Sequence, residues 1–575
     1  MQKTNVCTKK AHLTALQLPN TMSQRLDGKC QATTCRTTTT GSRTYYDISK
    51  INASKNLRNL SFFRIFIITA TYFLKKCYTY TMFFAKAKST LSGMRTCIAL
   101  VLFATLRSLS YPQETSVSGL YRYTLDNGLE LYVMENAAAP LAYIEIAVRA
   151  GGIAQTKENC GLFHLYEHMM FKGNERYPTA QAVTDALTHM GVTDWNGSTA
   201  VDYVNYYFTV PSDLLEEGLE FWSYAIRTPN LDDAEFEREK DVVIAEIQGN
   251  YSQPGDIAYS AVAKRLYPQE PWHLDPGGTV QAVRAATVQQ LLDIKNAYYV
   301  PNNSALFVGG SVHHEDVYQK VNAIYGTWQK SAAEIPAPFL PARNPVQETT
   351  YLVYPNPGMS PALTQVSVYM RGPDAETDAQ DTYAADVWGT LISNPDGAFK
   401  KALLRDERLD IPAPEYVAAY YYTQRASGRI SFYALLLNAQ NAAESARYAA
   451  EEAFPSAIDE MISGKRYFSA KELALAKKRM GTERRVAQET AEGFLGNLRF
   501  WWASADADYF LSYQAHVDAV DKRQIDAFLR KYVQDKKPVV MVQVAPQVYE
   551  AQKESFAEAG FSVVTQENAF WWSEL

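Results

Sequence analysis

The stretch Gly161-Leu-Phe-His164-Leu-Tyr-Glu167-His168-Met-Met-Phe-Lys-Gly173 places two histidines and one glutamate within five residues. On a helix, residues at i, i+3 and i+4 share one face, so His164 and His168 can bind one metal ion with Glu167 beside it. The apolar flanks are typical of a buried helix. Burying such groups without partners would cost about 1–3 kcal/mol each. The pattern therefore favours a zinc hydrolase site over the alternative of hydrogen-bonded core or surface histidines.

A hydrolytic zinc site uses three protein ligands and keeps one position for water, so a further acidic or histidine ligand is expected elsewhere. The best candidate segment begins at Asp232 with residues that cap helices, and its apolar residues follow at helical spacing. Within it, Glu239 and Glu246 are seven residues apart, two turns along one face. Taken alone, an acidic helix of this kind is more often a solvated surface.

The first stretch resembles the active-site helix of the insulinase/pitrilysin family of zinc metallopeptidases, the inverzincins, whose signature is His-x-x-Glu-His. The acidic segment matches the second motif of that family in its residues and in its distance from the first. The resemblance is to two-domain, processing-peptidase-like members. It implies that both histidines and Glu246 bind one Zn²⁺ per chain, that Glu167 is the general base, and that Glu239 supports the site. The expected activity is endoproteolysis of peptides or unfolded polypeptides.

Residues Trp195 to Ala200 predict a turn that leads into a strand over 201–210. This region resembles the edge strand that lies beside the zinc in the family. The resemblance implies that Asn196, Gly197 and Ser198 bind the substrate, because an extended peptide added to a sheet edge gains backbone hydrogen bonds whatever its sequence. The alternative is an ordinary hairpin strand.

The chain after Tyr111 is predicted to be α+β, with two tandem similar domains, each a mostly antiparallel sheet packed with helices. A hairpin around Asn127-Gly128 and an alternating strand over 142–149 open the first domain. A linker over 331–345 with four prolines marks the boundary. We expect a zinc-binding domain over 111–335 and a second domain over 346–575, which has no zinc motif.

The closing region predicts further regular elements of the second domain. Residues 442–461 and 469–499 show two long helical patterns, and residues 539–544 predict a short final strand. Only Cys160 remains after residue 110, so the folded body has no disulfide framework, and we interpret this cysteine as structural.

Residues 1–93 differ from the rest, with 15 Lys or Arg against two Asp and no Glu. They are expected to be disordered or a mistaken extension of the reading frame. Residues 94–110 resemble a secretory signal, with a basic start, a short apolar core and small residues at the end. This predicts an exported protein, periplasmic or extracellular. The alternatives are membrane association through the leader and organellar targeting.

Residues 111–575 carry 39 basic against 60 acidic side chains, so nucleic acid is not an expected ligand. Family active sites are assembled from four domains of this kind, whereas this chain has two. The resemblance therefore implies a homodimer, or a heterodimer with a related subunit.

The second domain departs from the family pattern. Active members carry an Arg and a Tyr seven residues apart that steady the substrate carbonyl. Here Arg405 is present, but Pro412 stands where the Tyr is expected, and Tyr416 lies nearby. Three interpretations remain: Tyr416 acts from a shifted loop, a partner subunit supplies the pair, or activity is reduced. A noncatalytic scaffold or partner subunit of the same fold is the alternative function.

Overall fold

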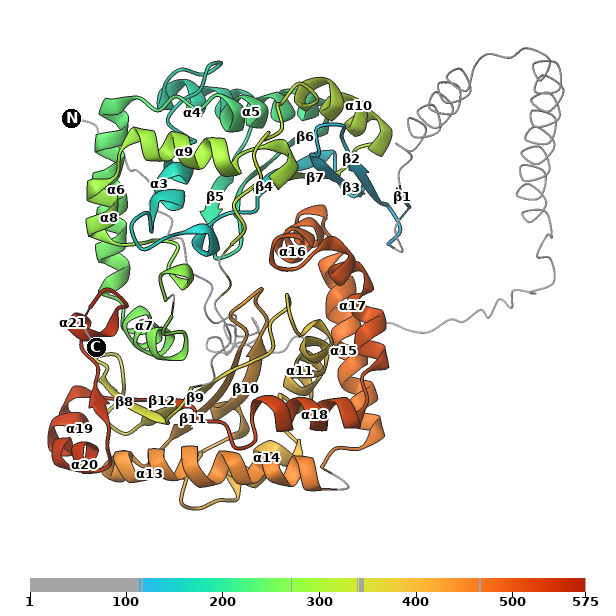
Figure 1. Ribbon diagram of the computed structural model, residues 1–575. Helices are drawn as coiled ribbons and strands as arrows, with labels where there is room; N and C mark the ends of the chain where they lie inside the picture. The colour runs from blue at the N-terminus through green and yellow to red at the C-terminus, as the bar shows by residue number, and fades with distance from the viewer. Residues whose placement is uncertain are drawn as a thin grey trace, which may run out of the picture. The chain divides into compact units, whose positions relative to one another are not determined.

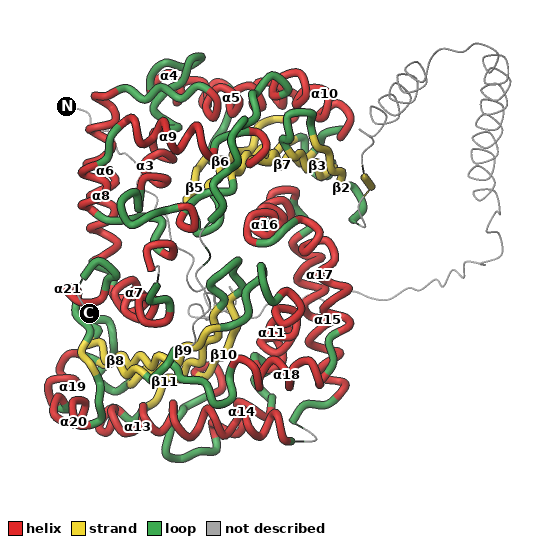
Figure 2. The backbone as a smooth tube through the Cα atoms, viewed as in Figure 1, coloured by secondary structure: helices red, strands yellow, loops and turns green. Residues whose placement is uncertain are grey.

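The computed structural model describes residues 113–114, 117–269, 271–338, 340, 346–464 and 467–573. The predicted leader over 1–93 and the signal-like segment over 94–110 lie outside these residues. In the described part, two mixed β-sheets are each packed with helices (Figures 1 and 2). The prediction of an α+β chain with two similar, mostly antiparallel sheet domains is confirmed.

The first sheet has the strand order β1-β2-β3-β7-β4-β6-β5, and only the β3–β7 pair is parallel. Its strands are β1 (Gln113–Glu114), β2 (Leu120–Thr124), β3 (Glu130–Glu135), β4 (Leu141–Val148), β5 (Trp195–Thr199), β6 (Val204–Pro211) and β7 (Ser304–Gly310). The predicted hairpin joins β2 to β3, where Gly128 adopts φ 88°, a conformation that suits glycine. The stretch predicted as a turn at Trp195 is itself the edge strand β5, so that detail of the prediction was wrong.

The helices of the first half form, in several cases, where a capping residue precedes a stretch with apolar residues at helical spacing. They are α3 (Leu162–Met169), α4 (Ala180–His189), α5 (Leu215–Arg227), α6 (Asp233–Tyr251), α7 (Pro254–Leu266), α8 (Val280–Ala285), α9 (Val288–Tyr298) and α10 (His314–Tyr325), with short 3-10 turns at Gly152–Ala154, Ser212–Leu214, Pro271–Leu274 and Pro301–Asn303. Asp232 caps α6 as expected, since its carboxylate accepts hydrogen bonds from the N–H groups of Ala234 and Glu235.

The second sheet has the order β10-β11-β9-β12-β8-β13, in which the β12–β8 and β8–β13 pairs are parallel. Its strands are β8 (Thr350–Pro355), β9 (Thr364–Arg371), β10 (Val417–Tyr422), β11 (Arg429–Leu436), β12 (Val539–Val544) and β13 (Ser562–Val563). The sequence predicted β12 to be the last strand. The structure adds a short strand, β13, which follows β12 after the two helices α19 and α20.

The second half carries more helices than the first. They are α11 (Ala379–Ile392), α12 (Ala398–Leu404), α13 (Ala442–Tyr448), α14 (Phe454–Ser463), α15 (Ala470–Ala487), α16 (Ala491–Ser504), α17 (Ala507–Ala519), α18 (Lys522–Tyr532), α19 (Pro546–Ala551), α20 (Lys553–Glu558) and α21 (Gln566–Ala569), with 3-10 turns at Pro414–Tyr416 and Ala439–Asn441 and a π-helical turn at Ala449–Ala453. The single helix predicted over 469–499 is two helices, because Thr490 starts a new one by accepting a hydrogen bond from the N–H of Gly493.

Each half sends one helix to the sheet of the other half. Helix α16 packs on the first sheet, where Leu498 and Trp502 join a core with Tyr132 and Phe307. Helix α7 packs on the second sheet through a separate core. Both faces of the first sheet are thereby covered, so every residue of β4 after Leu141 is buried, whereas the sequence predicted an alternating strand.

Candidate metal centre

Helix α3 carries the His-x-x-Glu-His residues and begins at a tight backbone contact. Its N-cap, Gly161, has φ 87° and packs so closely on Gly278 that a side chain at either position would collide with backbone. The apolar residues of α3 are buried, and Glu167 is only 7% exposed. The helix is thus fixed in the core, with its polar face turned toward α6 and β5, both of which contact it.

Three side chains from α3 and α6 meet at one point. The Nε2 atoms of His164 and His168 are 3.2 Å apart, and Oε2 of Glu246 lies 3.8 Å from the first and 3.6 Å from the second. Zinc with bonds of about 2.0–2.1 Å and tetrahedral geometry holds its ligands roughly 3.3–3.4 Å apart. The donor set of two imidazoles and one carboxylate fits zinc in type and spacing.

Glu239 lies one layer behind these three groups. Its Oε1 is 2.8 Å from Nδ1 of His168, and its Oε2 accepts from Lys172 Nζ at 2.6 Å. Burial acts to raise the pKa of Glu239, but the hydrogen bonds from His168 and Lys172 outweigh it and lower the pKa. A carboxylate behind a histidine fixes which ring nitrogen faces the metal, so Glu239 is placed to orient His168.

The two histidines have opposite electrostatic environments. Burial, together with the charge of His168, lowers the pKa of His164 to about 4. Burial also acts to lower the pKa of His168, but its hydrogen bonds to Glu239 and Glu246 raise that pKa to about 9. The acidic groups around His168 therefore favour a positive charge at this point, as a metal ion would supply.

Glu167 points to the edge of the first sheet and is not part of the group of three. Its Oε2 accepts a hydrogen bond from Thr199 Oγ1 at 2.8 Å, and a side chain at Gly197 would come within 2.7 Å of Oε1. Burial raises the pKa of Glu167 to about 7, against the opposing effects of His168 and Thr199. The carboxyl group is thus held beside the three candidate metal ligands with a pKa suited to exchanging protons near neutrality.

Strand β5 is the outermost strand of the first sheet and carries the predicted substrate-binding residues. Asn196 and Ser198 are exposed, whereas Gly197 is buried against Glu167. The structure therefore brings together the predicted residues of α3, α6 and β5. Two residues that contact the site, Thr199 and Lys172, were not predicted from the sequence. The available signal was that Thr199 directly follows Ser198 and that Lys172 closely follows the His-x-x-Glu-His stretch.

Among the described residues, Arg405 forms no hydrogen bond or ion pair with the residues of this centre. It is exposed at the end of α12. Tyr416 ends the 3-10 turn that comes directly before the edge strand β10 and is 36% exposed. The role predicted for Arg405 stays a prediction.

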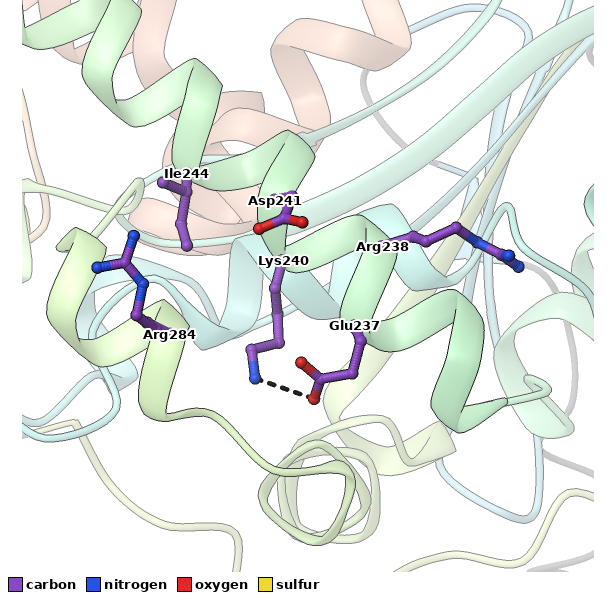
Figure 3. Close-up of a pocket in the computed structure, with 6 residues that line it drawn as sticks. All are labelled: Glu237, Arg238, Lys240, Asp241, Ile244 and Arg284. Carbon is purple, nitrogen blue, oxygen red and sulfur yellow. Dashed lines mark hydrogen bonds and ion pairs between the residues drawn. The ribbon is translucent and has the colours of Figure 1, made fainter.

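Two other polar groups lie away from the centre. The surface pocket in Figure 3 is lined by Glu237, Lys240, Asp241 and Arg284, among others, and holds none of the three candidate ligands. Glu135, His313 and His314 form a second cluster with metal-binding atoms within 4.8 Å. There, His314 already hydrogen-bonds Tyr123 through its ring and Glu135 through its N–H, so we assign no metal to it.

Comparison with family models identifies the class of protein. Residues 131–274 match the model of the insulinase family (peptidase family M16), and residues 285–480 match the model of the M16 inactive domain. Together the two matches span more than half of the chain, and the chain belongs to the insulinase family of peptidases.

Three curated relatives illustrate the range of this family. The chain is 23% identical over 198 residues to the mitochondrial-processing peptidase subunit beta of Dictyostelium discoideum, a match covering 34% of this chain and 42% of the relative. It is 25% identical over 233 residues to the zinc protease PqqE of Helicobacter pylori, covering 40% and 50%. It is 24% identical over 236 residues to the cytochrome b-c1 complex subunit 1 of Bos taurus, covering 40% and 48%. The chain thus matches half or less of each relative's length.

Solved structures share the fold. A protease from Helicobacter pylori superposes with a TM-score of 0.62 at 18% identity, covering 75% of this chain and all of that one. The first half of the periplasmic protease PqqL from Escherichia coli gives a TM-score of 0.63 at 15% identity, covering 78% and 97%. None of the helices described for this chain is long and apolar enough to cross a membrane.

Proposed function

We propose that this chain is a zinc-dependent endopeptidase that hydrolyses peptides or unfolded polypeptides. The observation that carries the proposal is the convergence of His164, His168 and Glu246 beside a buried carboxyl group, Glu167, that takes no part in the cluster. A structural zinc site would be closed by four protein ligands, whereas three ligands with a free acid nearby suit hydrolysis.

The residues have separate tasks in this mechanism. Zinc, when bound by the two histidines and Glu246, supplies a Lewis acid for water and for the scissile carbonyl. Glu167 accepts the proton of the attacking water and later donates it to the departing amine. Thr199 holds Oε2 of Glu167 through its hydrogen bond, so the carboxyl group is positioned before substrate arrives.

Strand β5 is proposed to bind the substrate backbone. Its outer edge pairs with no other described strand, and Asn196 and Ser198 are exposed along it. A peptide added there as a further strand would gain backbone hydrogen bonds, which suits a protease that reads little side-chain sequence.

The assembly and the location of the chain are further proposals. We assign the zinc-binding domain to 111–335 and the second domain to 346–575, and we expect a second copy or a related subunit to complete the active site. One relative is named as a subunit of a mitochondrial processing peptidase, which supports a partner. A structural neighbour is a periplasmic protease, which supports export.

A second candidate function is a noncatalytic subunit of the same fold. Pro412 in place of the expected Tyr favours it, as does the similarity to a cytochrome b-c1 complex subunit. The presence of Glu167 favours the endopeptidase over the noncatalytic subunit, because a protein that does not catalyse hydrolysis has no use for the group that activates water.

The test compares zinc content and cleavage of a quenched peptide library for the parent, His168→Gln and a matched control, His189→Gln, at the exposed end of α4. We expect about one zinc per chain and cleavage in the parent and the control, and loss of both in His168→Gln. Cleavage that survives complete removal of zinc would contradict the proposal. Zinc binding without cleavage, even with a second subunit, would favour the noncatalytic function.

A further inference from the structure

Two arginines lie side by side on neighbouring strands of the second sheet. Arg371 ends β9 and Arg429 begins β11, and the two are direct partners in the antiparallel register. Like charges in this position destabilise a sheet unless something neutralises them. An acidic partner is therefore expected nearby.

No ion pair with either arginine is found between described residues, although the carboxylate of Asp374 lies close by and accepts the N–H of Gly428, the residue before Arg429. The Nε–H groups of Arg371 and Arg429 are buried and donate no hydrogen bond among the described residues. Other half-buried arginines differ: Arg425 pairs with Glu376 at 3.1 Å, and Arg499 pairs with Glu145 at 2.8 Å. A buried N–H of a charged group without an acceptor is costly, so the arginine pair is suited to an anion from outside the chain.

Tyrosine rings hold both guanidinium groups in place. The Cζ of Arg429 lies 4.8 Å from the ring centre of Tyr259 and 5.4 Å from that of Tyr422. The Cζ of Arg371 lies 4.6 Å from the ring centre of Tyr267. Stacking covers the faces of a guanidinium and leaves the N–H groups in its plane without an acceptor from the rings. The side chains are thus ordered before a ligand binds.

The pair is connected to the candidate metal centre through helix α7. Tyr259 belongs to α7, which lies over the second sheet and contacts β9 and β12 (Figure 1). Helix α7 begins three residues after the last residue of α6, the helix that carries Glu246. A ligand held by the arginines would therefore lie against α7, the helix that directly follows the one carrying Glu246.

We propose that Arg371 and Arg429 form a binding site for a carboxylate of the peptide substrate, supplied either by its free C-terminus or by an acidic side chain. This inference rests on the proposed function. Guanidinium groups bind carboxylates through paired, charge-assisted hydrogen bonds, which matches the two free N–H edges. An anchor of this kind would add a preference for acidic or free-ended peptides to the sequence-independent pairing along β5.

The experiment measures peptide binding to the full chain carrying Glu167→Gln, so that cleavage does not interfere. Three fluorescent peptides of one sequence are compared by anisotropy: a free C-terminal acid, its carboxamide, and a carboxamide with one internal Gln replaced by Glu. We expect a carboxylate-bearing peptide to bind about tenfold more tightly than the neutral carboxamide, a difference of about 1.4 kcal/mol. The first and third peptides distinguish the terminal from the side-chain source.

Variants then locate the preference. Arg371→Gln and Arg429→Gln are expected to lose it, whereas Arg425→Gln, a neighbouring arginine paired with Glu376, is expected to keep it. If a Gln variant does not fold, Arg371→Lys and Arg429→Lys keep the charge and are expected to lose part of the preference, because Lys cannot form the paired contact.

A parent that binds all three peptides equally, or binds none, overturns the inference, as does a preference that survives in both Arg variants. The absence of proteolysis in the protein with Glu167 intact bears on the proposed function and not on this binding site. If the protein with Glu167 intact cleaves no peptide but the carboxylate preference is measured, the binding site stands and the proposed function fails.

Discussion

Replacing Gly197 by alanine is expected to remove most proteolytic activity without removing zinc or unfolding the chain. The added Cβ would lie 2.7 Å from Oε1 and 3.0 Å from Cγ of Glu167, whereas ordinary contacts begin near 3.4 Å. The carboxyl group must therefore move by about 0.7 Å from the position in which Thr199 holds its other oxygen. Because misplacing a catalytic group by about 1 Å can cost 10²-fold, we expect kcat to fall about 10- to 100-fold, or about 1.4–2.7 kcal/mol in the barrier.

The assay measures kcat and KM on a quenched peptide, with zinc content and thermal unfolding on the same samples. The matched control is Gly249→Ala on α6, where nothing lies within 4 Å of the added Cβ. This control should keep its activity and gain up to about 1 kcal/mol of stability from better helix propensity. Parent-like kcat in Gly197→Ala would refute the role of Glu167 as a base held in this position, and loss of zinc would show that the substitution disturbs more than Glu167.

Three further predictions follow from other contacts. Glu239→Gln should weaken zinc binding by about 10- to 100-fold in a chelator competition, because His168 loses the charged acceptor that orients it. Burial raises the pKa of Asp386 to about 7, so the folded chain keeps a proton that the unfolded chain releases near pH 4. Stability should therefore fall as pH rises from about 4 to about 7, and Asp386→Asn should make that fall smaller in thermal unfolding at pH 5 and pH 8. Arg499→Met should cost about 3–5 kcal/mol in chemical denaturation, since it leaves the fully buried Glu145 without its cation.

Each of these predictions has a result that would contradict it. Unchanged zinc affinity in Glu239→Gln would show that the contact with His168 does not support the metal. An unaltered pH profile in Asp386→Asn would mean that this carboxyl group does not titrate as described. For the third prediction, adding Glu145→Gln to Arg499→Met should recover much of the lost stability; no recovery would mean that packing, rather than the buried charge, causes the loss.

The grouping of the candidate metal ligands was predictable from the sequence to a large extent. Helical periodicity alone places His164, Glu167 and His168 on one face. The resemblance to the family selected Glu246 from an acidic helix that would otherwise be read as surface. The hairpin at Asn127-Gly128 was predictable as well, because its turn chemistry is local.

What sequence reasoning missed depends on contacts between distant segments. The burial of both faces of β4 follows from α16, which comes some 340 residues later in the chain. The Arg499–Glu145 pair has the same origin, since it joins α16 to β4. The break between α15 and α16 also escaped the prediction, because helical spacing continues through it and only the cap at Thr490 marks it. Neither half alone contains the signal for the burial of β4 or for the Arg499–Glu145 pair.

Zinc content and cleavage of unfolded polypeptide by Glu167→Gln, measured against the parent and against Glu175→Gln at an exposed position, decide whether Glu167 activates water for hydrolysis. We expect about one zinc per chain in all three proteins, with cleavage lost only in Glu167→Gln. Parent-like cleavage by Glu167→Gln, or carefully prepared parent protein that binds no zinc, would contradict it.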